Sequence, residues 1–141
     1  MTPYRQIYER FAQKISDIKL LSLSDEDIAS MMYCWMRSAC VNFLKSEYDL
    51  TDRDDTLQQF NYDLPELDQE IIANFMIVEW LEPQLNSTLL TSQFYGSKEE
   101  KFYAQANQLD KLMSLSDKNQ IKTKKLIRDY GYQKALKGVA T

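Results

Sequence analysis

The chain has 141 residues, 44% of them hydrophobic and 12% aromatic, so it is long enough for one domain with its own core, and this composition excludes a disordered protein. It holds only three glycines and three prolines, which argues against a turn-rich β-sandwich or barrel and favours long helices. The formal net charge of −4 excludes a general electrostatic attraction for nucleic acid.

The first helix is predicted to begin at Thr2, whose side chain is expected to cap it, and to end at about Lys19. Pro3 is tolerated in the first turn of a helix. Apolar side chains then follow at steps of three and four residues, which is the period of one helix face. They are Tyr4, Ile7, Tyr8, Phe11, Ile15 and Ile18.

The second helix is predicted from Ser24, as its cap, to about Lys45. Acidic residues at 25–27 favour the positive end of the helix dipole. Because large apolar residues lie on more than one side of this segment, we expect it to be the central and most buried helix. The expected buried residues are Ile28, Met31, Met32, Trp35, Met36, Ala39 and Phe43.

Residues 46–63 are acidic and weakly periodic, and we expect one short helical turn there, capped by Thr51 or Asp52 and carrying Leu57 and Phe60. A third helix is predicted from Asp63, with a capping-box variant and a proline in its first turn. The apolar run IIANFMIVEWL resembles a buried strand, but its length and capping favour a helix. Pro83 is expected to kink or end this helix. Residues 84–95 then form either a kinked continuation or a short separate helix.

The last helix is predicted to begin at a capping box, Ser97 to Glu100, and to run to Gly131. Its length of about 33 residues corresponds to roughly 50 Å. A break near residues 114–119 is the alternative. The sequence therefore predicts an all-α, single-domain bundle of about four helices over residues 1–131, with a long C-terminal helix. Residues 132–141 are expected to form a flexible, extended basic tail.

Both cysteines fall in the second predicted helix. Cys34 and Cys40 are six residues apart, about 240° around a helix axis, so they cannot pair with each other within it. We interpret them as small hydrophobic residues in a reducing cytosol. The N-terminus lacks the apolar stretch of a signal peptide, and no window of about 18 apolar residues occurs. We therefore expect no membrane association.

Charge is segregated along the chain. Residues 47–82 contain eleven acids and one base, Arg53, whereas residues 118–137 contain seven bases and one acid, Asp129. Such a polarised chain can dock onto a copy of itself, acid to base, or can place one sign of charge against another partner. The sequence thus predicts a component of an assembly.

Catalytic chemistry is mostly excluded. The chain has no histidine, which removes imidazole bases, Ser-His and Cys-His pairs and the usual zinc sites, and it has no glycine-rich phosphate loop. The acidic segment lacks the ligand spacing of a calcium-binding EF-hand. We therefore expect no enzyme activity, cofactor or metal, with carboxylate-only chemistry or metal binding as the alternative. Arg53 is interpreted as a residue that ties the acidic loop together.

The basic run near the C-terminus either contacts nucleic acid phosphates or pairs with the acidic loop of a neighbouring subunit, and the second interpretation is favoured. Tyrosines near the predicted helix ends (Tyr95, Tyr103, Tyr130 and Tyr132) suit the core and an interface equally well. The candidate partner-interface residues are Asp49, Asp52, Arg53, Asp54, Asp55, Lys122, Lys124, Lys125, Arg128, Tyr130 and Tyr132.

Three runs, DLTDRDDTLQQFNYDL, VEWLEPQLNSTLLTSQFYGSKEEKFYAQANQL and KKLIRDYGY, resemble a family of small proteins encoded by tailed bacteriophages and prophages. The resemblance extends over nearly the whole chain, from PYRQIYERF to RDYGY. It implies a structural role in the virion at the head–tail junction. An adaptor below the portal is the station that we expect, with a stopper or a tail terminator as alternatives.

The resemblance also implies partners. They are the portal protein, a downstream neck or tail protein, and other copies of this chain in a ring of about a dozen. The protein would be found in the host cytoplasm before assembly and in the virion afterwards, with incidental contact with passing DNA. The alternative function is a small phage-encoded regulatory or nucleic-acid-associated helical protein.

Overall fold

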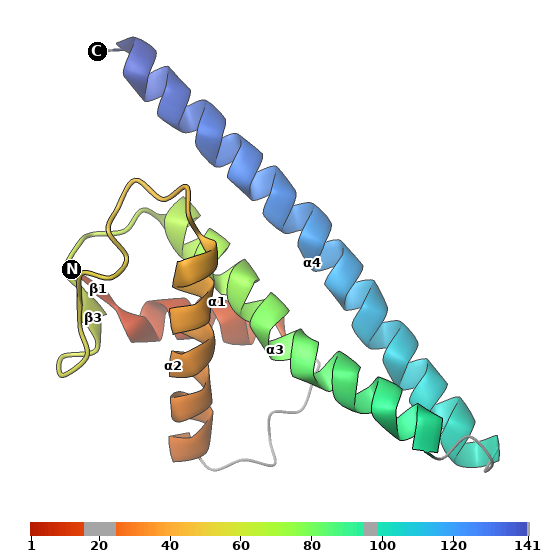
Figure 1. Ribbon diagram of the computed structural model, residues 1–141. Coiled ribbons are helices and arrows are strands. Elements are labelled where there is room, and N and C mark those ends of the chain that lie inside the picture. The colour runs from red at the N-terminus through yellow and green to blue at the C-terminus, as the bar shows by residue number, and fades with distance from the viewer. Residues whose placement is uncertain (16–24, 95–98, 141) are drawn as a thin grey trace.

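The computed structural model describes residues 1–15, 25–94 and 99–140. Within these ranges the chain forms four helices and three very short strands (Figure 1). The helices are α1 (Tyr4–Lys14), α2 (Asp25–Asn42), α3 (Glu66–Phe94) and α4 (Glu99–Ala140). The strands are β1 (Thr2–Pro3), β2 (Arg53–Asp54) and β3 (Gln59–Phe60). The predicted all-α bundle with a long C-terminal helix is confirmed.

The three strands form a small antiparallel sheet in the order β1-β3-β2, and the helical turn predicted near residues 51–60 was wrong. The Asp54 carboxylate accepts hydrogen bonds from the backbone N–H groups of Thr56 and Leu57, which bends the chain into a β-turn instead of starting a helix. Gln58 then adopts a left-handed conformation, with φ of 53°, and closes the four-residue loop between β2 and β3. We call β2, β3 and this loop the acidic hairpin.

Thr2 is not a helix cap, because it lies in β1. Its hydroxyl donates to the Tyr62 carbonyl and accepts from the Leu64 N–H, both at 2.8 Å, so it fastens β1 to the chain that follows the hairpin. Helix α1 begins at Tyr4 without a side-chain cap and ends at Lys14, five residues before the predicted end. The predicted remainder of this helix and the Ser24 cap lie outside the described residues.

Helix α3, rather than α2, is the central helix. Helices α1, α2 and α4 each pack against it (Figure 1). The run IIANFMIVEWL is apolar almost all round because α3 meets neighbours on several sides, which is the condition for a helix with no polar face. Its fully or almost fully buried apolar residues are Ile71, Ile72, Ala73, Met76, Ile77, Trp80 and Leu81. In α2, by contrast, Met31 is 40% exposed.

The N-terminal end of α3 differs from the prediction, and its C-terminal part follows one of the two alternatives. Pro65 immediately precedes the helix and its carbonyl accepts a hydrogen bond from the Gln69 N–H, while the Asp63 carboxylate contacts the Met1 ammonium instead of capping the helix. Pro83 does not end α3, which continues through it to Phe94. Of the two alternatives for residues 84–95, continuation of the same helix holds through residue 94.

Helix α4 is continuous, so the alternative break at residues 114–119 is excluded. A buried polar contact fixes this stretch: the Asn119 side-chain amide donates to the Asn74 carbonyl of α3 at 2.9 Å. Helix α4 also continues through Gly131 to Ala140, where a flexible tail was expected, so residue 131 does not mark the end of an element. The predicted capping box at Ser97 lies outside the described residues.

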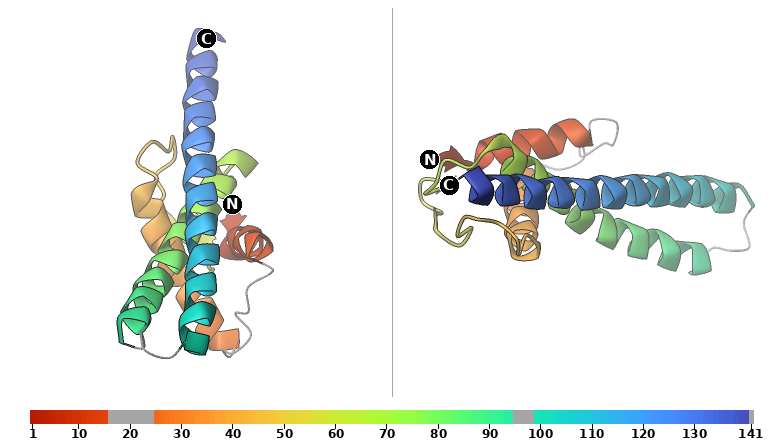
Figure 2. Two further views of the ribbon diagram at one scale, coloured as in Figure 1. Left: turned by 90° about the vertical axis from the view of Figure 1, so that its right-hand side faces the viewer. Right: turned by 90° about the horizontal axis from the view of Figure 1, so that it is seen from above.

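Helices α3 and α4 run antiparallel. The end at which α3 finishes and α4 begins reaches beyond α1 and α2, and the last turns of α4 stand clear of the bundle at the opposite end (Figures 1 and 2). The core lies where the first half of α3 meets the other three helices, and it includes Leu112 and Tyr130 of α4.

Candidate functional site

The acidic segment is an ordered structure in which several carboxylates serve the fold. Asp49 accepts hydrogen bonds from the Thr51 hydroxyl and N–H, and these bonds lower the pKa of its carboxyl group. Asp52 accepts from the Asn61 side-chain amide at 2.7 Å. Together with the turn-forming Asp54, these residues remain exposed or half-exposed, so they shape the hairpin and also present negative charge to solvent.

Arg53 ties the acidic loop together, as predicted. Its guanidinium donates to the Leu50 carbonyl at 2.9 Å, and its Nε lies 3.9 Å from an Asp55 carboxylate oxygen. The side chain is only 15% exposed. The principal partner is therefore a backbone carbonyl, with the carboxylate as a looser second contact.

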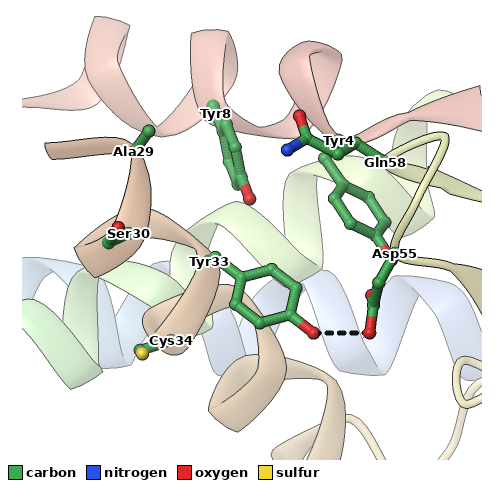
Figure 3. Close-up of a pocket in the computed structure, with 8 residues that line it drawn as sticks. All are labelled: Tyr4, Tyr8, Ala29, Ser30, Tyr33, Cys34, Asp55 and Gln58. Carbon is green, nitrogen blue, oxygen red and sulfur yellow. Dashed lines mark hydrogen bonds between the residues drawn. The ribbon is translucent and has the colours of Figure 1, made fainter. Parts of the chain in front are cut away.

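Beside the hairpin lies a cavity of about 450 Å³ that we call the tyrosine pocket (Figure 3). Three tyrosine rings line it: Tyr4 and Tyr8 from α1, and Tyr33 from α2. Asp55 of the hairpin lies at one end, where one oxygen accepts from the Tyr4 hydroxyl at 2.6 Å and the other from the Tyr33 hydroxyl at 2.8 Å. Three elements that are distant in sequence thus converge on one carboxylate.

The electrostatics of the tyrosine pocket follow from these bonds. The hydrogen bonds from Tyr4 and Tyr33 lower the pKa of Asp55, and the bond to Asp55 in turn raises the pKa of Tyr33. Burial, more than any neighbouring group, raises the pKa of Tyr4 and Tyr8. At neutral pH the pocket therefore combines a carboxylate anion with neutral, electron-rich phenol rings.

One of these rings already contacts a cation within the same molecule. The Arg37 guanidinium lies 5.8 Å from the centroid of the Tyr33 ring, a cation–π distance. Charge patterning predicted Asp55 as a candidate residue, whereas periodicity placed Tyr4 and Tyr8 on a helix face and left Tyr33 unassigned. No sequence signal brings them together, because their meeting depends on the pairing of β1 with β3.

The second charged surface is the outer face of α4. Lys124, Lys125 and Arg128 are exposed and make no ion pair with any part of the chain that the structure describes. The exposed apolar residues Ile121 and Tyr132 accompany them, at 71% and 64% exposure. This face points away from the bundle: at about 100° per residue, Arg128 lies about 160° around the helix from the buried Tyr130.

Lys122 lies at the edge of this face and is engaged within the molecule. A contact with the Lys14 ammonium, together with partial burial, lowers the pKa of Lys122. Lys14 in turn forms an ion pair with Glu70 at 2.6 Å, and Arg10 pairs with the same carboxylate at 2.8 Å. Lys118 joins Lys14 and Lys122 around a cavity of about 220 Å³.

The two tyrosine candidates for the interface differ in their burial. Tyr130 is only 6% exposed, its ring meets Phe43 edge-on at 5.3 Å, and it belongs to the core rather than to an interface. Tyr132, by contrast, is exposed on the outer face of α4. Tyr95 and the side chain of Tyr103 lie outside the described residues.

In the part of the chain that the structure describes, no three potential ligand side chains gather closely enough to hold a metal ion. None of the helices described there is long and apolar enough to cross a membrane. No protein-family model, no curated protein and no solved structure matches this chain. Membership of a phage protein family therefore stays a prediction from the sequence runs given above.

Proposed function

We propose that this chain is a non-catalytic structural protein of a bacteriophage neck, an adaptor that joins the portal to the tail machinery as a ring of identical subunits. The observation that carries the proposal is the presence of two exposed surfaces of opposite charge on different elements. The acidic hairpin region belongs to one surface and the outer face of α4 to the other. Surfaces that complement each other but not themselves favour head-to-tail contacts, which close into a ring when the rotation between subunits allows it.

The strength of such a contact decides whether the isolated subunits assemble without the portal. Pairs of exposed charges attract weakly and are screened by salt, so the subunits are expected to stay monomeric until the portal holds them together. Light scattering of the isolated protein at physiological salt should therefore report a monomer. A stable ring under those conditions would contradict this part of the proposal.

The extended ends of the α3–α4 pair support the adaptor role, because they offer contact surface beyond the bundle (Figure 2). On this proposal the outer face of α4 engages a neighbouring subunit or the portal. The acidic residues 47–68 face the next subunit or the channel, where negative charge would repel DNA and help it to slide.

The deciding experiment is charge reversal of Lys124, Lys125 and Arg128 to glutamate in an infecting phage. We expect filled heads without tails, seen by electron microscopy, because the outer face of α4 would no longer pair with its acidic partner. The matched control is Lys45→Glu, which reverses an exposed charge in the turn that follows α2. Normal tail joining in the triple variant would remove these residues from the junction.

One observation favours a second candidate function. Lys14, Lys118 and Lys122 surround one small cavity, and such a concentration of positive charge also suits the phosphate groups of nucleic acid. A binding assay with random duplex DNA over a range of salt distinguishes the two functions. Micromolar affinity with a steep salt dependence would favour a nucleic-acid-associated protein, whereas no measurable binding at low salt would favour the adaptor.

A further inference from the structure

The tyrosine pocket has the chemistry of a receptor for a planar cation. Faces of tyrosine rings attract cations, and the Tyr4 centroid lies 6.4 Å from that of Tyr8 and 6.0 Å from that of Tyr33, so the rings form a curved wall. Asp55 supplies a carboxylate at the end of this wall, and its two tyrosine partners hold it in a fixed orientation. The volume of about 450 Å³ accommodates the end of a long side chain.

The charge around the pocket also favours a cation. Asp49, Asp52, Asp54 and Asp55 place four negative charges in this segment, whereas Arg53 and Arg37 contribute two positive charges, one against the Leu50 carbonyl and one at the Tyr33 ring. The surrounding field is therefore negative, and it would attract a positively charged group from solution toward the pocket mouth.

The chain itself carries a matching group. Arg128 is exposed and unpaired among the described residues, and it lies near the middle of the outer face of α4 with Tyr132 one turn away. A guanidinium suits this pocket better than a lysine ammonium does, because it is planar, stacks on aromatic rings and offers two parallel donors to a carboxylate.

Arg128 cannot serve the pocket of its own molecule. The pocket is built from α1, α2 and the acidic hairpin, whereas α4 packs on α3, which lies between α4 and α2 (Figure 1). Arg128 also points away from the bundle, since it lies on the side of α4 opposite the buried Tyr130. Only a second molecule can bring this guanidinium to the pocket.

We propose that the tyrosine pocket receives Arg128 of a second copy of this chain, with the guanidinium over the tyrosine rings and against Asp55. This inference rests on the proposed self-association and names the contact that produces it. The contact is head-to-tail, because the pocket and Arg128 lie on different surfaces of each molecule.

The test uses the full chain in sedimentation experiments at about 0.01 M ionic strength, where the Debye length is about 30 Å, and at protein concentrations up to about 1 mM. We expect the average mass of the wild-type protein to rise with concentration. Asp55→Asn and Arg128→Gln should each weaken association about tenfold, since each removes one partner of the charge pair. Lys45→Gln should have no effect.

Mixing the two variants gives a sharper result. Asp55→Asn retains Arg128, and Arg128→Gln retains an intact pocket, so an equimolar mixture should form heterodimers as strongly as the wild-type contact but nothing larger. An interface that made the pocket contact twice between the same two molecules would keep only one of the two contacts in the mixed pair, so that pair would be weaker than the wild-type dimer. Restored pairing therefore identifies the residues, and a mixed pair as strong as the wild-type contact identifies the head-to-tail geometry.

Two further measurements distinguish loss of the contact from misfolding of a variant. Ala29→Phe fills the pocket from its exposed rim without touching the Asp55 hydrogen bonds, and it should weaken association as Asp55→Asn does while its thermal melting stays near that of the wild type. Cys34 also lines the pocket, so its alkylation should slow as the wild-type protein is concentrated, but not in Arg128→Gln.

The inference is overturned if the wild-type protein does not associate under these conditions, if folded Asp55→Asn and Ala29→Phe proteins associate like the wild type, or if the mixture forms no heterodimer. The proposed function and the pocket contact are tested by different outcomes. If charge reversal on α4 abolishes tail joining while Asp55→Asn phage assemble normally, the adaptor role stands and the pocket contact does not.

Discussion

The Tyr130 hydroxyl accepts a hydrogen bond from the backbone N–H of Glu47 at 2.7 Å, although the two residues are 83 positions apart. The same hydroxyl lies 3.3 Å from a carboxylate oxygen of Asp68, to which it donates. The basic C-terminal helix and the acidic segment, which the sequence separates, are therefore joined within one molecule by a buried tyrosine.

Tyr130→Phe tests this junction. The change removes both hydrogen bonds and leaves the backbone N–H of Glu47 without its partner, so the free energy of unfolding should fall by about 1–2 kcal/mol. Chemical denaturation monitored by tryptophan fluorescence measures the difference. Tyr132→Phe, at an exposed position on the same helix, should change the free energy by less than about 0.5 kcal/mol. Equal effects of the two substitutions would contradict the buried role of Tyr130.

Gly131→Ala tests whether α4 really continues past residue 131. Glycine is a poor helix former, and no atom outside the local helix lies within 4 Å of the position that a Cβ atom would occupy. If the helix continues, alanine should raise the free energy of unfolding by about 0.5–1 kcal/mol. A decrease in stability, or no change with no gain in helical circular dichroism, would show that residue 131 lies where the helix ends.

Glu70 should make stability depend on acid pH. Burial opposes ionisation of this carboxyl, but hydrogen bonds from Lys14 and Arg10 outweigh it and lower the pKa in the folded state. The ionised form therefore favours folding, and its contribution is complete above the unfolded pKa of about 4.3 and is lost as the pH falls through the lower folded value.

Thermal melting between about pH 6 and pH 3 measures this effect. Glu70→Gln should reduce the loss of stability on acidification, because the variant has no carboxyl to titrate at this position. Glu82→Gln is the control, since it removes an exposed carboxyl group from the same helix. An unchanged acid profile in Glu70→Gln would remove this network as a source of pH dependence.

The two cysteines should react at very different rates. Cys34 is exposed, whereas burial raises the pKa of the Cys40 thiol to about 12 and also shields it from reagents. At pH 8, a thiol reagent should modify one equivalent rapidly in the native protein and a second only in denaturant. Cys34→Ser should abolish the fast phase. Two fast equivalents in the native wild-type protein would mean that α2 does not pack as described.

Much of the helical architecture could be predicted from the periodicity of apolar residues, because an amphipathic helix repeats them on the face that it buries. Tyr4, Ile7 and Phe11 recur at helical steps and are all buried against the core. The central helix was misjudged, since the number of neighbours around a helix depends on tertiary packing. The caps predicted at Thr2 and at Thr51 or Asp52 were wrong for a related reason: short polar side chains cap helices and stabilise turns with equal ease, and distant partners decide between the two.

Only part of the candidate site could be predicted from the sequence. Charge counting identified Asp55 and Arg128 because charge segregation is a property of the linear chain. The tyrosine pocket was not foreseen, because Tyr4 and Tyr33 meet at Asp55 only after β1 pairs with β3. The burial of Tyr130 was likewise undetermined, since an aromatic residue near a predicted helix end suits both core and interface.

The unbroken course of α4 has a mechanical consequence. Its 42 residues make a strut of about 63 Å at 1.5 Å per residue. A loose tether would absorb any displacement of whatever binds it, whereas a continuous helix packed on α3 over part of its length behaves as a lever. Torque applied at its C-terminal turns would be felt at the opposite tip of the molecule.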